Sequence, residues 1–184
     1  MQERYRKLPN SINSLGAKLQ MNKILIIGIV ASGKTTLAKR LSKTLSIPWF
    51  ELDCIVHIQT ENERYKRTQE EQIAVINKID SLGSWIFEGT DRESYRCLFD
   101  MADTIIFLDT PLWKRRLRIF VRFLKQKFGV EKSNYKPDIK MLKMMYIWTN
   151  DFEKNRANFE ERLQLHENKL IRLTDNKNLK TFHP

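Results

Sequence analysis

Short apolar runs alternate with amphipathic stretches along most of this chain. Five runs have the length and the β-branched or aromatic content of buried strands, and they cover residues 23–27, 49–52, 84–89, 104–108 and 169–173. Between them, apolar residues recur at helical spacing over about 36–45, 68–82, 92–99, 112–128, 138–148 and 151–165. This alternation predicts a three-layer α/β fold, in which helices cover both faces of a parallel sheet. The polar stretch at 59–67 predicts irregular structure.

The expected helix at 112–128 has two distinct faces. Its large apolar side chains fall within one arc, which predicts a stripe that faces the core; they are Trp113, Leu117, Phe120, Leu124 and Phe128. Basic side chains fall on the opposite side, and they are Arg115, Arg118, Arg122 and Lys125. Since no acidic residue lies between Pro111 and Val130, this face is not an ordinary solvated surface of mixed charge. The basic face therefore indicates an anionic neighbour.

A glycine-bearing loop joins the first strand to the first helix. Residues 28–36 read GIVASGKTT and fit the phosphate-binding pattern G-x-x-x-x-G-K-[ST]. Gly28 and Gly33 allow the backbone to turn tightly and to direct its N–H groups at a polyphosphate. Lys34 then supplies a positive charge, and the Thr35 hydroxyl is a ligand for Mg²⁺. The predicted nucleotide site comprises Gly28, Ala31, Ser32, Gly33, Lys34, Thr35 and Thr36.

Two aspartates follow expected strands, at the sheet edge where α/β proteins bind ligands. Asp53 directly follows the strand at 49–52 and is a candidate for contact with a substrate hydroxyl. The alternative is that Asp53 serves only as a turn or helix-cap residue. Asp109 follows the strand at 104–108 and is an alternative magnesium residue, but an aspartate before Thr-Pro also commonly begins a helix.

Composition constrains the size, the partners and the cellular compartment of the protein more than it constrains its reaction. The 184 residues are 41% hydrophobic, which suits one domain with a full core. The net charge of +11 favours anionic partners without choosing among nucleotide, nucleic acid and acidic membrane. Two cysteines without metal or disulfide spacing, and no signal-peptide or membrane-spanning run, predict a cytoplasmic protein with no membrane partner. We expect residues 1–20 to be a flexible extension of a domain at 21–184.

The chain resembles the P-loop kinases related to adenylate and shikimate kinases, and within them most closely the group called DNA topology modulation proteins. The resemblance runs from about 21 to 173 and is carried by residues 24–45, 52–53, 85–89 and 102–109. It implies a five-stranded parallel sheet in the order 2-3-1-4-5, ATP with Mg²⁺ as cofactors, and a basic helical lid at about 112–150.

Further residues match motifs of this group. The sequence Glu88-Gly89-Thr90-Asp91-Arg92 is similar to the Asp-Gly-x-Pro-Arg element of nucleoside monophosphate kinases, whose arginine holds the acceptor's phosphate; here Glu88 replaces Asp and Asp91 replaces Pro. Asp53 matches an acidic substrate ligand of shikimate-type kinases. The stretch Lys136-Pro137-Asp138 looks like the lid's Arg-Pro-Asp. The lid arginines of such kinases correspond in position to Arg115, Arg116, Arg118 and Arg122.

These observations together predict an ATP-dependent phosphotransferase that acts on an unidentified small molecule or nucleotide, as a monomer or homodimer. The expected catalytic residues are Lys34, Asp53, Arg115, Arg118 and Arg122, and the expected substrate residues are Asp53, Glu88, Gly89 and Arg92. The alternative is a nucleic-acid-binding P-loop protein. We consider it weaker because the aromatic residues of 112–128 are expected to pack in the core, whereas single-strand binders expose theirs.

Overall fold

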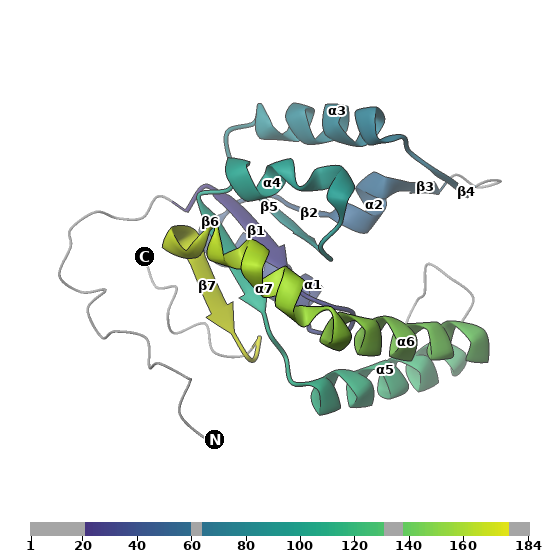
Figure 1. Cartoon of the computed structure of the whole chain (residues 1–184). Helices are drawn as coiled ribbons and strands as arrows, with labels where there is room; N and C mark the ends of the chain where they lie inside the picture. Colours follow the sequence, from purple (N-terminus) through teal and green to yellow (C-terminus); the bar gives the residue numbers. More distant parts are fainter. Residues whose placement is uncertain (1–20, 60–63, 131–137, 177–184) are drawn as a thin grey trace, which may run out of the picture.

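The computed structural model describes residues 21–59, 64–130 and 138–176, so the predictions for 1–20 and for Lys136 and Pro137 lie outside it. A five-stranded parallel sheet forms the centre of the molecule (Figure 1). It contains β1 (Lys23–Ile27), β2 (Trp49–Glu51), β5 (Trp85–Gly89), β6 (Thr104–Leu108) and β7 (Leu170–Leu173). Their order is β2-β5-β1-β6-β7, which confirms the predicted order of the five expected strands.

Helices cover both faces of this sheet, as the alternating pattern predicts. On one face lies α1 (Lys34–Leu45), whose buried Leu37, Ala38 and Leu41 pack on strand residues such as Ile24 and Ile26. The other face is covered by α2 (Leu52–Val56), α3 (Gln69–Asp80), α4 (Cys97–Met101) and α7 (Arg156–Gln164). Two 3₁₀ turns, η1 (Glu93–Tyr95) and η2 (Glu167–Lys169), precede α4 and β7.

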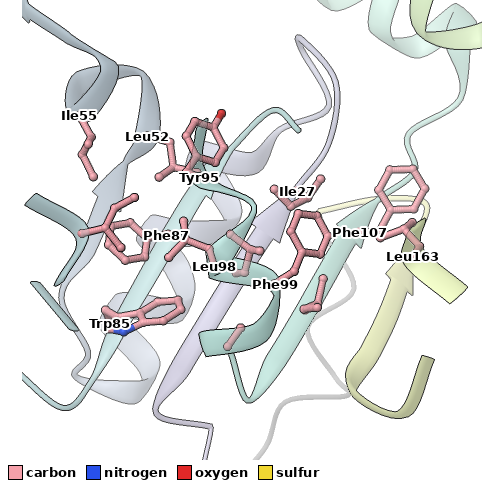
Figure 2. Packing of buried hydrophobic residues seen from close by; sticks show 14 of the residues in the cluster. Ile27, Leu52, Ile55, Trp85, Phe87, Tyr95, Leu98, Phe99, Phe107 and Leu163 are labelled. Carbon is pink, nitrogen blue, oxygen red and sulfur yellow. The ribbon is translucent and has the colours of Figure 1, made fainter. Parts of the chain in front are cut away.

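Aromatic side chains fill much of the second face. Figure 2 shows Trp85 and Phe87 of β5 on the sheet, with Leu98 and Tyr95 in the same cluster. The ring centroids of Trp85 and Phe87 lie 4.7 Å apart. Phe107 of β6 meets the edge of Phe159 from α7 at 5.0 Å. Burying side chains of this size stabilises the fold by about 1.5–3 kcal/mol each. These contacts fix β5 and β6 within the sheet, and the carboxyl end of β5 carries residues of the candidate site.

A pair of long helices lies beside the sheet. These are α5 (Leu112–Lys127) and α6 (Ile139–Lys154), which run side by side at one edge of the molecule (Figure 1). A small apolar cluster of Ala31, Ile119 and Met145 joins them to the phosphate-binding loop. The break expected after residue 148 is absent, since α6 continues to Lys154. The side chain of Asp138 caps its start by accepting a 2.7 Å hydrogen bond from the N–H of Met141.

The predicted orientation of α5 is wrong. Trp113 and Phe128, expected in the core, are 64% and 75% exposed, whereas Arg115, expected outside, is 1% exposed. The arginines turn inward, where protein oxygens accept hydrogen bonds from them. Arg115 donates to the Thr110 carbonyl at 2.9 Å and pairs with Glu153, and Arg118 donates to the Ser32 carbonyl at 2.6 Å. The aromatic face therefore no longer argues against the nucleic-acid alternative.

A second correction concerns the stretch expected to be irregular. β3 (His57–Gln59) and β4 (Arg64–Lys66) pair as an antiparallel ribbon, which Arg67 ties to α2 by donating to the Ile55 carbonyl at 2.6 Å. These strands are too short and too polar to show an alternating pattern. Within the described part of the chain, none of the helices has the length and apolar character needed to cross a membrane.

Candidate active site

The phosphate-binding loop has the shape that an anion requires. Gly33 has a φ of +102°, which a side chain would strain. A Cβ on Gly28 would lie 2.7 Å from Ser32 Oγ and 3.0 Å from the Leu108 carbonyl oxygen, so only glycine fits there without a shift. α1 begins directly after Gly33, and no side chain caps its first N–H groups. The N-terminal end of α1 is thus suited to an anion, because its free backbone N–H groups and the helix dipole favour negative charge.

Lys34 lies at the start of α1 and turns back over the loop. Its ammonium group donates to the Ile29 carbonyl at 3.1 Å. Burial lowers the pKa of this ammonium, and the negative charges of Glu88 and Asp53 oppose that shift. A phosphate group in the same place would oppose it further and keep Lys34 charged.

Thr35 joins the loop to the neighbouring strand. Its hydroxyl donates a 2.6 Å hydrogen bond to the carboxylate of Glu88, which lies near the end of β5. Burial raises the pKa of Glu88, while Lys34 and the Thr35 hydroxyl act in the opposite direction. A hydroxyl beside a carboxylate suits Mg²⁺, which binds few protein oxygens and completes its shell with phosphates and waters. Among the described residues, no group of three or more His, Cys, Asp or Glu could hold a metal ion.

A charged pair lies at the end of β2 and in the loop after β5. Asp53, in the first turn of α2, accepts a 2.8 Å hydrogen bond from Arg92, and both side chains are partly exposed. Tyr95 fixes the loop that carries Arg92, because its hydroxyl donates to the Thr90 carbonyl at 2.5 Å. The pair therefore presents a carboxylate and a guanidinium on a fixed backbone.

The loop and this pair line the same cleft, of about 570 Å³. Most of the residues predicted for the site take part in its walls: Gly28, Ala31, Gly33, Lys34, Thr35, Thr36, Asp53, Glu88, Gly89, Arg92 and Arg122. Ser32 is buried behind the loop. Glu88, predicted to contact the substrate, is bonded to Thr35 and so belongs to the phosphate side of the cleft.

The three arginines of α5 predicted to be catalytic have different positions. Arg122 lines the cleft, and its charge lowers the pKa of Lys34. Arg118 instead donates to the carbonyls of Ala31 and Ser32 behind the loop. Arg115 donates to the Thr110 carbonyl, and Thr110 in turn donates to the Ser32 carbonyl at 2.9 Å. Arg115 and Arg118 thus hold the loop from behind, outside the cleft.

Several residues of the cleft are not among the predicted site residues. Asp91 accepts a 2.5 Å hydrogen bond from Arg162 of α7, and both line the cleft. α6 contributes Trp148 and Asp151 to the same wall. Glu51 was also missed, although its position two residues before Asp53 at a strand end was a usable signal.

Asp109, the alternative magnesium residue, has other partners. It forms ion pairs with Arg156 and Arg172, and Arg172 also pairs with Glu160. These charges join β6, β7 and α7, so Asp109 holds elements of the fold together and does not line the cleft.

Comparison with known proteins gives related but partial matches. No family model matches the chain. Over 98 residues it is 33% identical to a shikimate kinase of Flavobacterium psychrophilum, which covers 47% of this chain and 57% of that relative. The solved shikimate kinase of Acinetobacter baumannii, in complex with shikimate, aligns with a TM-score of 0.50 and 14% identity over 77% of this chain and 80% of that chain. An uncharacterized protein from Eubacterium ventriosum aligns with a TM-score of 0.49 and 14% identity, over 88% and 95% of the respective chains.

The chain therefore spans somewhat more than half the length of the curated relative it matches. The sheet order, the flanking helices and the structural likeness together show the three-layer P-loop fold. A relation to kinases of the shikimate and adenylate type is supported, whereas the likeness to the topology modulation group stays a prediction.

Proposed function

We propose that this protein is an ATP-dependent kinase that transfers the γ-phosphoryl group to a hydroxyl of a small acceptor. The observation that carries the proposal is the shared cleft. The phosphate-binding loop with Lys34 opens into it, and so does the Asp53–Arg92 pair. Phosphoryl transfer requires mainly in-line positioning of two substrates and positive charge around the transferred group, and this cleft offers both.

The donor half uses the loop and the start of α1. The loop N–H groups and Lys34 would hold the phosphates of ATP, and the Thr35 hydroxyl would hold Mg²⁺ with Glu88 as its hydrogen-bonded neighbour. When bound, Mg²⁺ neutralises charge on the β- and γ-phosphate oxygens. Arg122, which also lines the cleft, would add a second positive charge. An arginine in this role is worth about 10³–10⁵ in rate.

The acceptor half uses Asp53 and Arg92. In the transfer, an acceptor hydroxyl oxygen forms a bond to the γ-phosphorus while the bond from that phosphorus to the β,γ-bridging oxygen breaks. Asp53 takes the hydroxyl proton, and ADP leaves. Before the transfer, Arg92 would orient an anionic group of the acceptor. It would exchange part of its pairing with Asp53 for a contact with that group.

The acceptor class follows from the same residues and from the curated relative. That relative is a shikimate kinase, and shikimate offers both a hydroxyl and a carboxylate. A small hydroxylated acid is thus the first acceptor class to test, followed by sugars, nucleosides and nucleoside monophosphates.

The test is a screen of these acceptors with ATP and Mg²⁺, in which ADP formation and a phosphorylated product are both measured. Lys34→Ala should lower turnover by at least about 10²-fold, since it removes charge from the transferring group. Lys43→Ala is the matched control, because Lys43 lies exposed on the same helix. If no acceptor is phosphorylated and Lys34→Ala binds ATP as tightly as the wild type, the proposal is wrong.

A further inference from the structure

The outer surface of α5 carries a continuous apolar stripe. It consists of Trp113, Leu117, Phe120, Val121 and Phe128, and we call it the outer stripe. The exposed fractions of Leu117, Phe120 and Val121 are 56%, 46% and 40%. At 3.6 residues per turn these five side chains fall within an arc of about 100°. Exposed apolar residues scattered singly need no explanation, but a contiguous stripe marks a surface that binds something.

The inner surface of α5 fixes this orientation. Arg115 and Ile119 are buried, and Arg118 is bonded to the phosphate-binding loop. Rotating α5 to bury the outer stripe would leave a guanidinium without the Thr110 carbonyl and Glu153. The stripe is therefore held outward by contacts that the loop itself requires. α5 lies beside α6 at the edge of the molecule, where its outer surface is accessible (Figure 1).

Basic side chains border the outer stripe on both sides. Lys114 and Lys125 lie along one edge, and Arg116 and Lys127 lie along the other. The helix itself has no acidic residue. Lys114 pairs with Asp175 at 3.1 Å from outside the helix, and Arg116 donates to the neutral amide of Asn150, so Lys125 and Lys127 carry most of the positive charge of the borders. Long basic side chains beside an apolar stripe can extend outward while their methylene stems stay in apolar surroundings.

We propose that α5 binds the surface of an anionic lipid bilayer through the outer stripe and its basic borders. A helix with Trp, Phe and Leu on one face and lysines and arginines beside them lies in the plane of a membrane interface, with its apolar face among the acyl chains. Anionic headgroups complement the basic borders and the net charge of +11. This is attachment to one leaflet, and the 16-residue helix does not cross the bilayer. The proposal departs from the sequence-based prediction of no membrane partner, which depended only on the absence of a spanning run and of a signal peptide.

Charge and side-chain type favour this occupant over three others. A second copy of the chain would bring two basic borders together. The segment at 1–20 would meet the same repulsion if it covered the outer stripe, because it is itself basic. It contains Arg4, Arg6, Lys7 and Lys18 and only one glutamate. Single-stranded nucleic acid stacks its bases on aromatic rings, but two of the five side chains of the outer stripe, Leu117 and Val121, are aliphatic and offer no ring.

The experiment is sedimentation of the full chain with phosphatidylcholine vesicles, with and without phosphatidylglycerol. The double variant Leu117→Ser/Phe120→Ser removes two exposed side chains of the outer stripe. Its control is Leu165→Ser, which changes a leucine outside α5 that is 79% exposed. The wild type and the control should bind anionic vesicles at least about tenfold more tightly than the double variant, by loss of buried apolar area. Lys125→Glu/Lys127→Glu should weaken binding to vesicles that contain phosphatidylglycerol and leave binding to pure phosphatidylcholine vesicles unchanged. Salt at about 1 M should also weaken binding to the anionic vesicles.

Trp113 provides a direct signal. Its fluorescence should shift to shorter wavelength with anionic vesicles, and Trp113→Phe should lose that component. Circular dichroism checks that each variant is folded. The proposal is overturned if the wild type ignores anionic vesicles, or if the double variant binds them equally well. It is also overturned if the double variant instead abolishes a dimer seen by light scattering or binding to a single-stranded oligonucleotide.

Discussion

The Thr35 hydroxyl donates a 2.6 Å hydrogen bond to the Glu88 carboxylate, although burial raises the pKa of that carboxyl. An ionised carboxylate in such surroundings costs free energy unless a cation or several donors compensate it. Lys34 and Thr35 compensate part of that cost. A buried carboxylate retained beside the phosphate-binding loop is consistent with a site that favours a bound cation over the stability of the empty protein.

Glu88→Gln should stabilise the empty protein and impair its activity. The folded-state pKa of Glu88 lies above its usual value of 4.5, so the stability that it contributes is present below that value and is lost as the pH rises through the folded pKa. The variant lacks that loss. Thermal melting without nucleotide should therefore show a gain over the wild type that is larger at pH 8 than at pH 5.

Activity should change in the opposite direction. An amide cannot support a cation beside Thr35 as a carboxylate does, so we expect turnover with Mg²⁺ to fall about 10- to 100-fold. Glu167→Gln, an exposed change of the same kind, should alter neither property. A variant that melts lower than the wild type at pH 8 would contradict this account.

Asp53→Asn should lower kcat with little change in the affinity for ATP. It removes the oxygen proposed to take the acceptor's proton, and general-base catalysis contributes about 10²–10⁴ in rate. Arg92→Ala should act mainly on the acceptor's KM, because its proposed role is to orient the acceptor. Steady-state kinetics with each substrate varied in turn separates the two effects. Equal losses in kcat for both variants, with KM unchanged, would argue against separate roles.

Gly28→Ala should weaken nucleotide binding more than it weakens the fold. The new Cβ would lie 2.7 Å from Ser32 Oγ and 3.0 Å from the Leu108 carbonyl oxygen, so the loop must shift. We expect a loss of at least about tenfold in ATP affinity, with a cost of about 1–3 kcal/mol in the free energy of unfolding.

Gly83→Ala is the informative control for that variant. Gly83 has a φ of +82°, but no atom lies within 4 Å of the new Cβ. It should cost about 1–2 kcal/mol through backbone strain and leave ATP affinity unchanged. Calorimetric titration with ATP, together with urea unfolding, measures both quantities. A comparable loss of affinity in the two variants would show that stability alone is responsible.

The central sheet and the phosphate-binding loop were predictable because their signals are local. β1 and β6 are buried on both faces and so read as unbroken apolar runs, and residues 28–35 must be adjacent to form the loop. The β3–β4 ribbon was missed because three-residue polar strands carry no period. Its pairing is visible only once the chain is folded.

The prediction of which face of α5 is buried was wrong for a different reason. Hydrophobic periodicity assumes that apolar side chains avoid water and that charges seek it, but Arg115 is buried with a carbonyl and a carboxylate as partners. One of those partners, Glu153, is 38 residues away in the sequence. Arg162 reaches Asp91 in the cleft across 71 residues. Such pairs depend on how α6 and α7 are placed, and no local pattern records that placement.

Arg115 provides the sharpest test of this reversed helix. Arg115→Met should destabilise the protein by about 2–4 kcal/mol, because it removes one partner of a largely buried ion pair and leaves the Thr110 carbonyl without its donor. Arg116→Met, one residue along the same helix but exposed, should change stability by no more than about 0.5 kcal/mol. Urea unfolding monitored by circular dichroism gives both values.

A catalytic Arg115 would behave differently, and the same variants distinguish the two roles. If Arg115 acts on the phosphates, as the sequence predicts, Arg115→Met should lose turnover while the protein stays as stable as the wild type. If Arg115 holds the loop through Thr110, adding Glu153→Gln to Arg115→Met should recover part of the lost stability. The second change replaces the carboxylate that has lost Arg115 by a neutral amide. Stability that is unchanged in Arg115→Met would refute the structural role, because a guanidinium with 1% exposure cannot be lost from its partners without cost.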